Sequence, residues 1–124
     1  LQWIDEVAGG VAKRHSGCQN VTTAAIDNLQ FKAGIYAGDL VVLIGKVTYT
    51  GRTSMEVRVD TYAENSQGMR RPVNRAYFVM VGMNEEDKPT PVPALLVETE
   101  SERAEWEGAL KRKEYRLLRR RDGF

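Results

Sequence analysis

Hydrophobic residues recur at every third or fourth position at the start of the chain. In the stretch LQWIDEVAGGVAKRHSG they stand at positions 1, 3, 4, 7, 8, 11 and 12. This spacing places them on one face of a helix that packs against a core. Gly17 and Asn20 then supply stop and turn residues, so the pattern predicts a helix that ends near His15.

Two segments with strand character follow this helix. The segment 20–31, NVTTAAIDNLQF, is rich in β-branched residues, and KAGIYAGD then turns the chain. The segment 40–50, LVVLIGKVTYT, begins as a continuous apolar run and ends in alternation, which is typical of a strand covered on both faces at one end. The short sequence GRT forms a tight connection to the next strand.

The clearest alternation is in the segment 54–65, SMEVRVDTYAEN. It predicts a strand with one core face, made of Met55, Val57, Val59, Thr61 and Ala63. We expect the opposite face to be exposed to solvent, and its residues are Glu56, Arg58, Asp60, Tyr62 and Glu64. The next segment, SQGMRRPVN, has the composition of a loop, and the apolar run 76–83, AYFVMVGM, is typical of a central strand.

The last part of the chain predicts a second helix. The Pro-rich sequence NEEDKPTPVP, at 84–93, is expected to be a surface connection. Thr99 and Glu102 then have the spacing of a capping box, and the helix they open carries acids in its first turns and bases in its last. One helix, four strands with connections too short for a crossover helix, and this final helix predict an α+β fold whose antiparallel sheet wraps the first helix.

Composition supports a single globular domain. The chain has 124 residues, of which 42% are hydrophobic and 28% charged, and no apolar stretch approaches the length that spans a membrane. Its one cysteine, Cys18, rules out an internal disulfide and fits a reducing cytosol. No signal peptide is visible. The chain starts without Met, inside a helical pattern, so we expect further residues upstream.

Charge is unevenly distributed. The net charge of the chain is +1, but the segment 111–124 carries +5 and the remainder therefore −4. A basic run of this kind can meet phosphate, although it is more often a solvated helix end.

Asp5 is the first candidate for chemistry. It lies among apolar residues, with Gly9 one turn later on the same side of the helix. A glycine in a helix interior costs roughly 1 kcal/mol relative to alanine, so Gly9 and Gly10 imply close approach of a backbone or a ligand. A carboxylate beside such a groove can act as a general base or nucleophile on an acyl compound, whereas at the edge of an apolar stripe it would be only a cap or a solvated charge.

The single histidine lies too far from Asp5 to share one reaction with it. His15 follows Asp5 by ten residues, which is about 15 Å along a helix. A helix C-terminal cap is therefore the expected role of His15, and neither a Ser-His-Asp triad nor a zinc site has support.

The turn between the second and third strands is the other candidate site. Its sequence TYTGRTSMEV places a glycine, a cation and two hydroxyls in a row, at Gly51, Arg52, Thr53 and Ser54. This group suits an ordinary hairpin turn, or a contact with a phosphate or amide. No nucleotide-hydrolysis loop of the GxxxxGKS or GxGxxG type is present.

Taken in order, several stretches resemble the cytosolic acyl-CoA hydrolase family of hotdog-fold thioesterases. The resemblance runs from Trp3 to about Arg112. It is carried by WIDEVAGGVAKRHSG, VTTAAIDNLQF, GD at 38–39, VTYTGRTSMEVRV, EN at 64–65, AYFVMVGMNEEDKP and VPALLVETESE. It implies a hotdog domain at 1–110, followed at 111–124 by a basic helix end or tail.

The resemblance implies hydrolysis of acyl-CoA to a free fatty acid and CoA, without a metal or a cofactor. Asp5 stands where the family has its acidic residue, which acts as general base or nucleophile across a dimer interface. The resemblance further implies CoA contacts by Gly51, Arg52, Thr53 and Ser54, with Thr22 lining the pantetheine channel. A cytoplasmic homodimer, assembled as a trimer of dimers, with no nucleic-acid or membrane partner, is expected.

One departure from the family pattern concerns the residues before the helix. Family members have a His-Gly-Gly stretch there, preceded by a first strand, and backbone amides near the helix N-terminus polarise the thioester carbonyl. Both features are absent from the chain, and we expect them upstream of Leu1.

Two alternative functions stay open from the sequence. A hotdog 3-hydroxyacyl-CoA dehydratase would need a histidine close to the acid, which His15 could supply only from a neighbouring subunit. A non-catalytic acyl-CoA sensor, or a nucleic-acid binder that uses the basic tail, would show salt-sensitive binding. The tail has few aromatic residues between its basic ones, so nucleic-acid binding is the least favoured of these alternatives.

Overall fold

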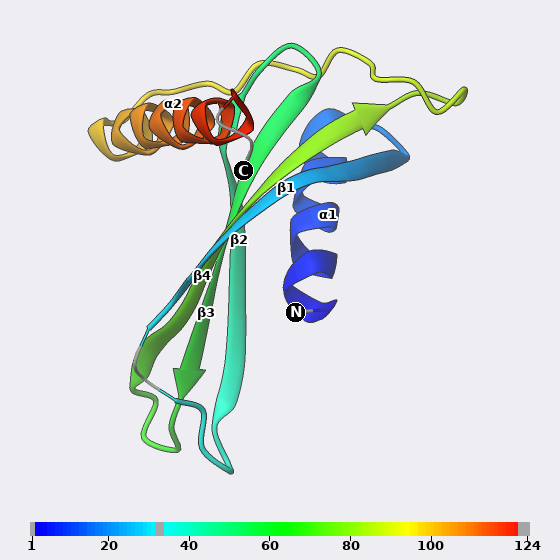
Figure 1. Cartoon of the computed structure of the whole chain (residues 1–124). Coiled ribbons are helices and arrows are strands. Elements are labelled where there is room, and N and C mark those ends of the chain that lie inside the picture. Colours follow the sequence, from blue (N-terminus) through cyan, green and yellow to red (C-terminus); the bar gives the residue numbers. More distant parts are fainter. Residues whose placement is uncertain (1, 32–33, 122–124) are drawn as a thin grey trace.

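The fold is one antiparallel sheet with a helix on each face (Figure 1). The computed structural model describes residues 2–31 and 34–121. Along the chain the elements are α1 (Gln2–Ser16), β1 (Asn20–Gln30), β2 (Leu40–Thr50), β3 (Ser54–Glu64), β4 (Arg70–Met83) and α2 (Glu100–Arg121). The strand order is β1-β4-β3-β2, and every neighbouring pair is antiparallel. The predicted α+β class and the antiparallel sheet around α1 are confirmed.

Helix α1 packs against the sheet through small residues. Ala8 and Ala12 are fully buried, together with the side chains of Met55, Val57, Val59, Ala76, Phe78 and Met80. A Cβ atom at Gly45 of β2 would come within 2.9 Å of the Val7 and Val11 side chains. The absence of a side chain at Gly45 therefore lets α1 approach the sheet closely enough to complete the core.

Helix α2 covers the other face of β3, so the prediction that this face would be exposed to solvent is wrong. Glu56 and Asp60 are only 2% and 5% exposed. They are buried as partners in ion pairs, which is the condition under which proteins bury charge. Asp60 accepts a hydrogen bond of 2.6 Å from Arg75 and lies 3.1 Å from Arg58, which also bonds Glu105 of α2. Strand alternation alone could not reveal a helix that arrives some forty residues later.

The Glu56 carboxylate is the most enclosed of these charges. Arg112 of α2 donates two hydrogen bonds to it, of 2.9 Å to Oε2 and 2.7 Å to Oε1, and the Thr48 hydroxyl donates another of 2.6 Å to Oε1. The Arg112 guanidinium also lies 3.6 Å from the centroid of the Tyr77 ring. Burial lowers the pKa of Arg112, but the bonds to Glu56 outweigh this effect and raise it overall.

The basic end of α2 is tied to the sheet. Arg116 donates a hydrogen bond of 2.8 Å to Asp27 of β1, and Arg119 lies 3.4 Å from the same carboxylate. The interpretation of this run as a solvated helix end is therefore wrong for Arg116, which is largely buried, whereas Arg119 stays about half exposed. Helix α2 also continues without a break across residues 110 and 111.

Strand β4 begins earlier than expected. The structure starts it at Arg70, within the segment predicted as a loop. Pro72 lies opposite Tyr62, at a point where the register of β3 and β4 shifts. Such irregularities are where a sheet tolerates a residue without an N–H, so the proline did not mark the end of the loop.

Local hydrogen bonds fix the ends of two elements. The capping box of α2 is confirmed, because Glu102 N–H donates to Thr99 Oγ1 and Thr99 N–H to Glu102 Oε1, each at 3.0 Å. Before β2, Asp39 accepts hydrogen bonds from the Tyr36 N–H at 2.8 Å and from Arg71 at 2.5 Å. These two donors, the backbone amide first, hold the pKa of Asp39 below its usual value.

Within the described part of the chain, neither helix is long and apolar enough to cross a membrane.

Replacing Arg112 by alanine leaves the Glu56 carboxylate buried without its cation. We expect Arg112→Ala to lower the free energy of unfolding by about 3 kcal/mol, measured by urea denaturation. Lys111→Ala is the matched control, since Lys111 is exposed on the same helix, and it should change stability by less than about 0.5 kcal/mol. Equal effects of the two substitutions would show that the Glu56–Arg112 pair does not hold α2.

Replacing Asp39 by asparagine should alter how stability depends on pH. Because its pKa is lower in the folded state, Asp39 adds stability above about pH 3.9, and this is lost as the pH falls through the folded-state pKa. Asp39→Asn should therefore lower the melting temperature at pH 7, and the difference from the wild type should shrink below about pH 4. A difference that is constant between pH 7 and pH 3 would contradict this.

Candidate functional site

The first candidate residue, Asp5, lies in the first turn of α1 with its side chain exposed. Ile4, Val7, Ala8 and Val11 turn toward the core, so the helix presents Asp5 on a different side. There it lines a groove of about 420 Å³ between α1 and the β1 end of the sheet. The remaining lining residues are Glu6, Gly9, Gly10 and Lys13 of α1, Val21 and Thr23 of β1, and Met80 of β4.

The groove has charges of opposite sign along its length. Asp5 and Glu6 stand toward one end, and Lys13 lies eight residues later, about 12 Å along the helix axis. Between them the helix side is bare backbone at Gly9 and Gly10. The sheet side is closed by Thr23, whose hydroxyl donates to Met80 Sδ at 3.3 Å. The groove can thus hold an extended chain, with a carboxylate near one end of the helix and a cation near the other.

The two glycines of the groove have no packing role within the described residues. A Cβ atom at Gly9 or Gly10 would meet nothing within 4 Å, in contrast to Gly45. Each costs the helix about 1 kcal/mol relative to alanine, and no contact in the described chain offsets this. The open space over them is therefore available to a ligand or to another chain.

The structure brings Gly51, Arg52, Thr53 and Ser54 together as the turn between β2 and β3. Gly51 N–H donates to Ser54 O at 2.8 Å, and a Cβ atom at Gly51 would lie 2.9 Å from Ser54 Oγ. The Arg52 and Thr53 carbonyls accept hydrogen bonds from Val92 and Gly82. Arg52 is exposed.

Within one chain, neither this turn nor Thr22 lies in the groove that Asp5 lines. None of the four turn residues is among the described residues that line it. Thr22 pairs with Val81, which pairs in turn with Ser54. Residues paired across two strands lie on the same face of a sheet, and successive residues of one strand lie on opposite faces. Thr23 lines the groove on the α1 face, so Thr22 lies on the face away from α1.

Sequence reasoning missed Lys13, Glu6, Thr23 and Met80 as groove residues. Lys13 had a visible signal, because residues 5, 9 and 13 follow the four-residue spacing of one helix face. Thr23 and Met80 depend on the pairing of β1 with β4, two strands far apart in the sequence, so no local pattern shows them.

His15 is occupied elsewhere. Its Nε2 atom lies 2.8 Å from the carbonyl oxygen of Pro93, so it ties the end of α1 to the connection before α2. It does not approach Asp5 within the chain. Among the described residues, no group of three His, Cys, Asp or Glu side chains is placed to hold a metal ion.

Comparison with known proteins gives consistent matches. A family model described as Thioesterase superfamily matches residues 1–69. The rat cytosolic acyl coenzyme A thioester hydrolase is 40% identical over 112 residues, which is 86% of this chain. The chain spans only 29% of the length of that curated relative. An uncharacterized acyl-CoA thioester hydrolase of Bacillus subtilis is 34% identical, over 98% of this chain and 70% of its own length.

Solved structures match over nearly the whole chain. An apo-hexameric acyl-CoA thioesterase has a TM-score of 0.86 and 40% identity, over 96% of this chain and 76% of its own. An acyl-CoA hydrolase from Staphylococcus aureus, in complex with butyryl coenzyme A and coenzyme A, has a TM-score of 0.87 and 31% identity, over 98% and 74%. These likenesses confirm the hotdog arrangement of α1 and the sheet.

Two glycine-to-alanine substitutions should distinguish a glycine that core packing requires, Gly45, from one that borders the open groove, Gly9. Gly45→Ala puts a methyl group 2.9 Å from Val7 and Val11 and should lower the melting temperature by several degrees. Gly9→Ala meets no atom and should raise the free energy of unfolding by up to about 1 kcal/mol. Thermal melts of both variants check this. Destabilisation by Gly9→Ala as large as that by Gly45→Ala would contradict an open groove.

Proposed function

Because this chain belongs to the Thioesterase superfamily, we propose that it hydrolyses acyl-CoA thioesters to a free acid and CoA. The observation that carries the proposal is the position of Asp5, exposed on α1 beside two helix glycines in an open groove. A carboxylate beside a bound acyl group can catalyse thioester hydrolysis, and bare helix backbone admits the flat thioester close to that carboxylate. The groove combines both requirements.

In the proposed reaction, Asp5 acts on the thioester carbonyl in one of two ways. As a general base, its carboxylate takes a proton from water while the water oxygen attacks the carbonyl carbon, and the C–S bond then breaks to release CoA thiolate. As a nucleophile, it attacks the carbonyl carbon and forms a mixed anhydride as the C–S bond breaks and CoA thiolate leaves, and water then hydrolyses the anhydride. In both routes the thiolate takes up the proton that the attacking water gives up. Either route ends in a carboxylic acid, CoA thiol and a regenerated carboxylate.

The groove also suggests how the substrate lies. With the thioester near Asp5, an extended arm that follows α1 past Gly9 and Gly10 reaches Lys13, whose charge suits a phosphate. The CoA contacts proposed for Gly51, Arg52, Thr53, Ser54 and Thr22 then require a neighbouring subunit, because these residues lie outside the Asp5 groove of their own chain. We therefore propose that the chain works as a homodimer that assembles as a trimer of dimers, which agrees with the hexameric state of the similar apo acyl-CoA thioesterase.

The proposed setting of the reaction is the cytosol, which the name of the rat relative states for that protein. Neither a metal nor a cofactor takes part in the proposed steps, because a carboxylate and water suffice for both.

Substitution of Asp5 tests the proposal. Asp5→Asn keeps the size of an exposed side chain and removes its charge, so the protein should fold normally. Hydrolysis of acyl-CoA esters of increasing length, followed by release of free thiol, should fall by about a hundredfold or more for every ester that the wild type cleaves.

Glu6→Gln is the matched control for this experiment. Glu6 is the next residue of α1, it is also exposed, and it lines the same groove. It should retain activity within a few-fold of the wild type. Wild-type turnover by Asp5→Asn, or an equal loss in Glu6→Gln, would remove Asp5 from the mechanism.

A further inference from the structure

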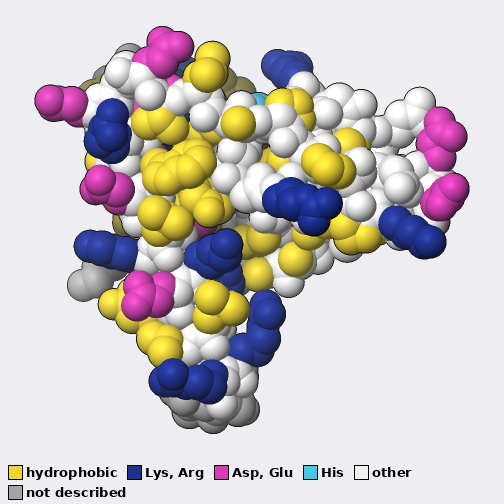
Figure 2. Space-filling model, turned by 90° about the horizontal axis from the view of Figure 1, so that it is seen from above, with side chains coloured by type: hydrophobic (Ala, Val, Ile, Leu, Met, Phe, Trp, Pro, Cys, Tyr) yellow, Lys and Arg dark blue, Asp and Glu magenta, His cyan; other side chains and the backbone are white. Residues whose placement is uncertain are grey.

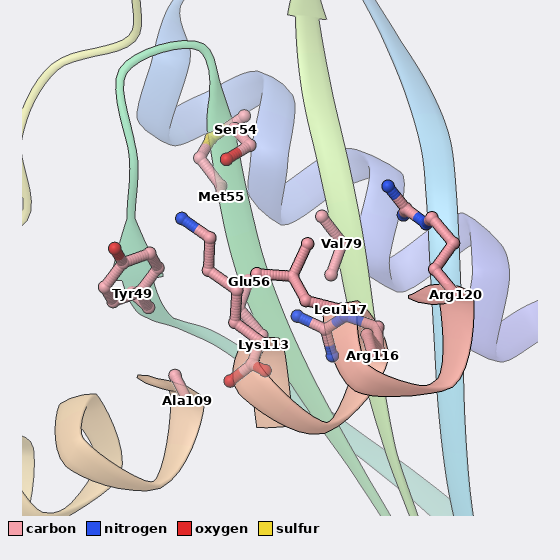
Figure 3. Close-up of a pocket in the computed structure, with 10 residues that line it drawn as sticks. All are labelled: Tyr49, Ser54, Met55, Glu56, Val79, Ala109, Lys113, Arg116, Leu117 and Arg120. Atoms are coloured by element: carbon pink, nitrogen blue, oxygen red, sulfur yellow. The ribbon is translucent and has the colours of Figure 1, made fainter. Parts of the chain in front are cut away.

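A second cavity, of about 160 Å³, lies between α2 and the sheet, on the face away from α1 (Figure 3). Its lining is amphipathic. The apolar part is made of Tyr49, Val79, Ala109 and Leu117, and Met55 also borders the cavity although its side chain belongs to the core on the α1 side of the sheet. The basic part is made of Lys113, Arg116 and Arg120, all from α2, and Ser54 and Glu56 complete the wall.

The basic residues occupy the side of α2 that faces the sheet. Positions 113, 116, 117 and 120 follow the spacing of three or four residues that forms one helix face. In a helix packed on a sheet this face is normally apolar. Figure 3 shows Lys113 and Arg120 on opposite sides of the cavity, with Leu117 and Val79 between them. The arrangement sets two cations around an apolar centre.

The carboxylate that lines the cavity does not neutralise these cations. Glu56 is the sole carboxylate among the described lining residues, and its oxygens already accept bonds from Arg112 and Thr48. Arg116 is paired with Asp27. Within the residues that the structure describes, no carboxylate forms an ion pair with Lys113 or Arg120. Positive charge therefore remains at the cavity.

The apolar centre is partly open to solvent. Leu117 is 53% exposed although it lines the cavity beside these cations. In Figure 2, Lys and Arg side chains lie beside hydrophobic ones toward the lower end of the view, where α2 ends. A cavity of about 150 Å³ holds a molecule the size of benzene, so this one accepts about six carbons of an alkyl chain, and the rest of a medium-length chain would lie along the exposed side of Leu117.

We propose that this cavity binds an anionic amphiphile, whose apolar tail lies against Leu117 and Val79 while its acidic head lies between the positive charges of Lys113 and Arg120 on either side. The tail gains from leaving water, and the head gains from the positive field of the two cations. An alkyl carboxylate has this chemistry. The site lies on the opposite face of the sheet from Asp5, so the proposal does not depend on hydrolysis at the groove.

Trp106 provides a local reporter of binding. Its ring centroid is 4.4 Å from that of Tyr49, which lines the cavity. The chain has two tryptophans, so Trp3→Phe leaves Trp106 as the single one. Titration with octanoate, followed by Trp106 fluorescence and calorimetry, should show saturable binding. Octanol, which lacks the charge, and inorganic phosphate, which lacks the tail, should bind at least about tenfold more weakly.

Charge reversals locate the site on α2. In the same background, Lys113→Glu and Arg120→Glu should each weaken octanoate binding by at least about tenfold. Lys111→Glu is the matched control, because it makes the same charge change on the same helix outside the cavity, and its affinity should stay within about twofold. Circular dichroism checks folding, and Lys113→Gln replaces Lys113→Glu if the latter does not fold.

Several results would overturn the proposal. These are no saturable octanoate binding by the wild type, equal binding of octanol or of phosphate, or unchanged octanoate affinity in both cavity variants. An equal loss in Lys111→Glu would also overturn it, since the effect would then be one of net charge alone.

Discussion

The structure depends on the close approach of α1 to the sheet at Gly45. Any side chain at this position would collide with Val7 and Val11, and the two residues of the helix that contribute to the fully buried core, Ala8 and Ala12, are small. This contact sets the rotation of α1 about its own axis, because an apolar stripe can face the core in only one way. Asp5, Gly9 and Lys13 consequently share the side that opens toward β1 and β4. The chemistry proposed for the groove is thus a result of core packing.

Helix α2 covers the charged face of the sheet. β3 carries acids and bases on the face away from α1, and α2 covers them with side chains of complementary charge, chiefly Arg112 on Glu56 and Glu105 on Arg58. The Arg112–Glu56 pair tolerates burial because each carboxylate oxygen is hydrogen-bonded. The sheet is therefore enclosed by an apolar layer on one side and an ionic layer on the other. Each layer leaves a cavity of its own character, an open groove beside α1 and an amphipathic pocket beneath α2.

The sequence predicted those features that local patterns control. The apolar spacing of α1, the alternation around Val57 and the Thr99–Glu102 capping box each correspond to an element in the structure. It did not predict features set by distant partners. The burial of Glu56 depends on a residue fifty-six positions later, and the presence of Thr23 in the groove depends on the pairing of β1 with β4. Pro72 suggested a loop because its position opposite a register shift is visible only in the sheet. The roles of Asp5 and of the turn 51–54 stay predictions.

The proposed mechanism requires that an acyl-CoA thioester lies against Asp5, over the bare backbone of Gly9. The most direct measurement is a crystal structure of the full-length protein with a non-hydrolysable acyl-CoA analogue, in which a methylene group replaces the thioester sulfur. The ketone carbon should lie about 3–3.5 Å from an Asp5 carboxylate oxygen, or from a single water held by it. An analogue bound with its carbonyl more than about 10 Å from every Asp5 carboxylate in the assembly would contradict it, since no proton transfer or attack spans that distance.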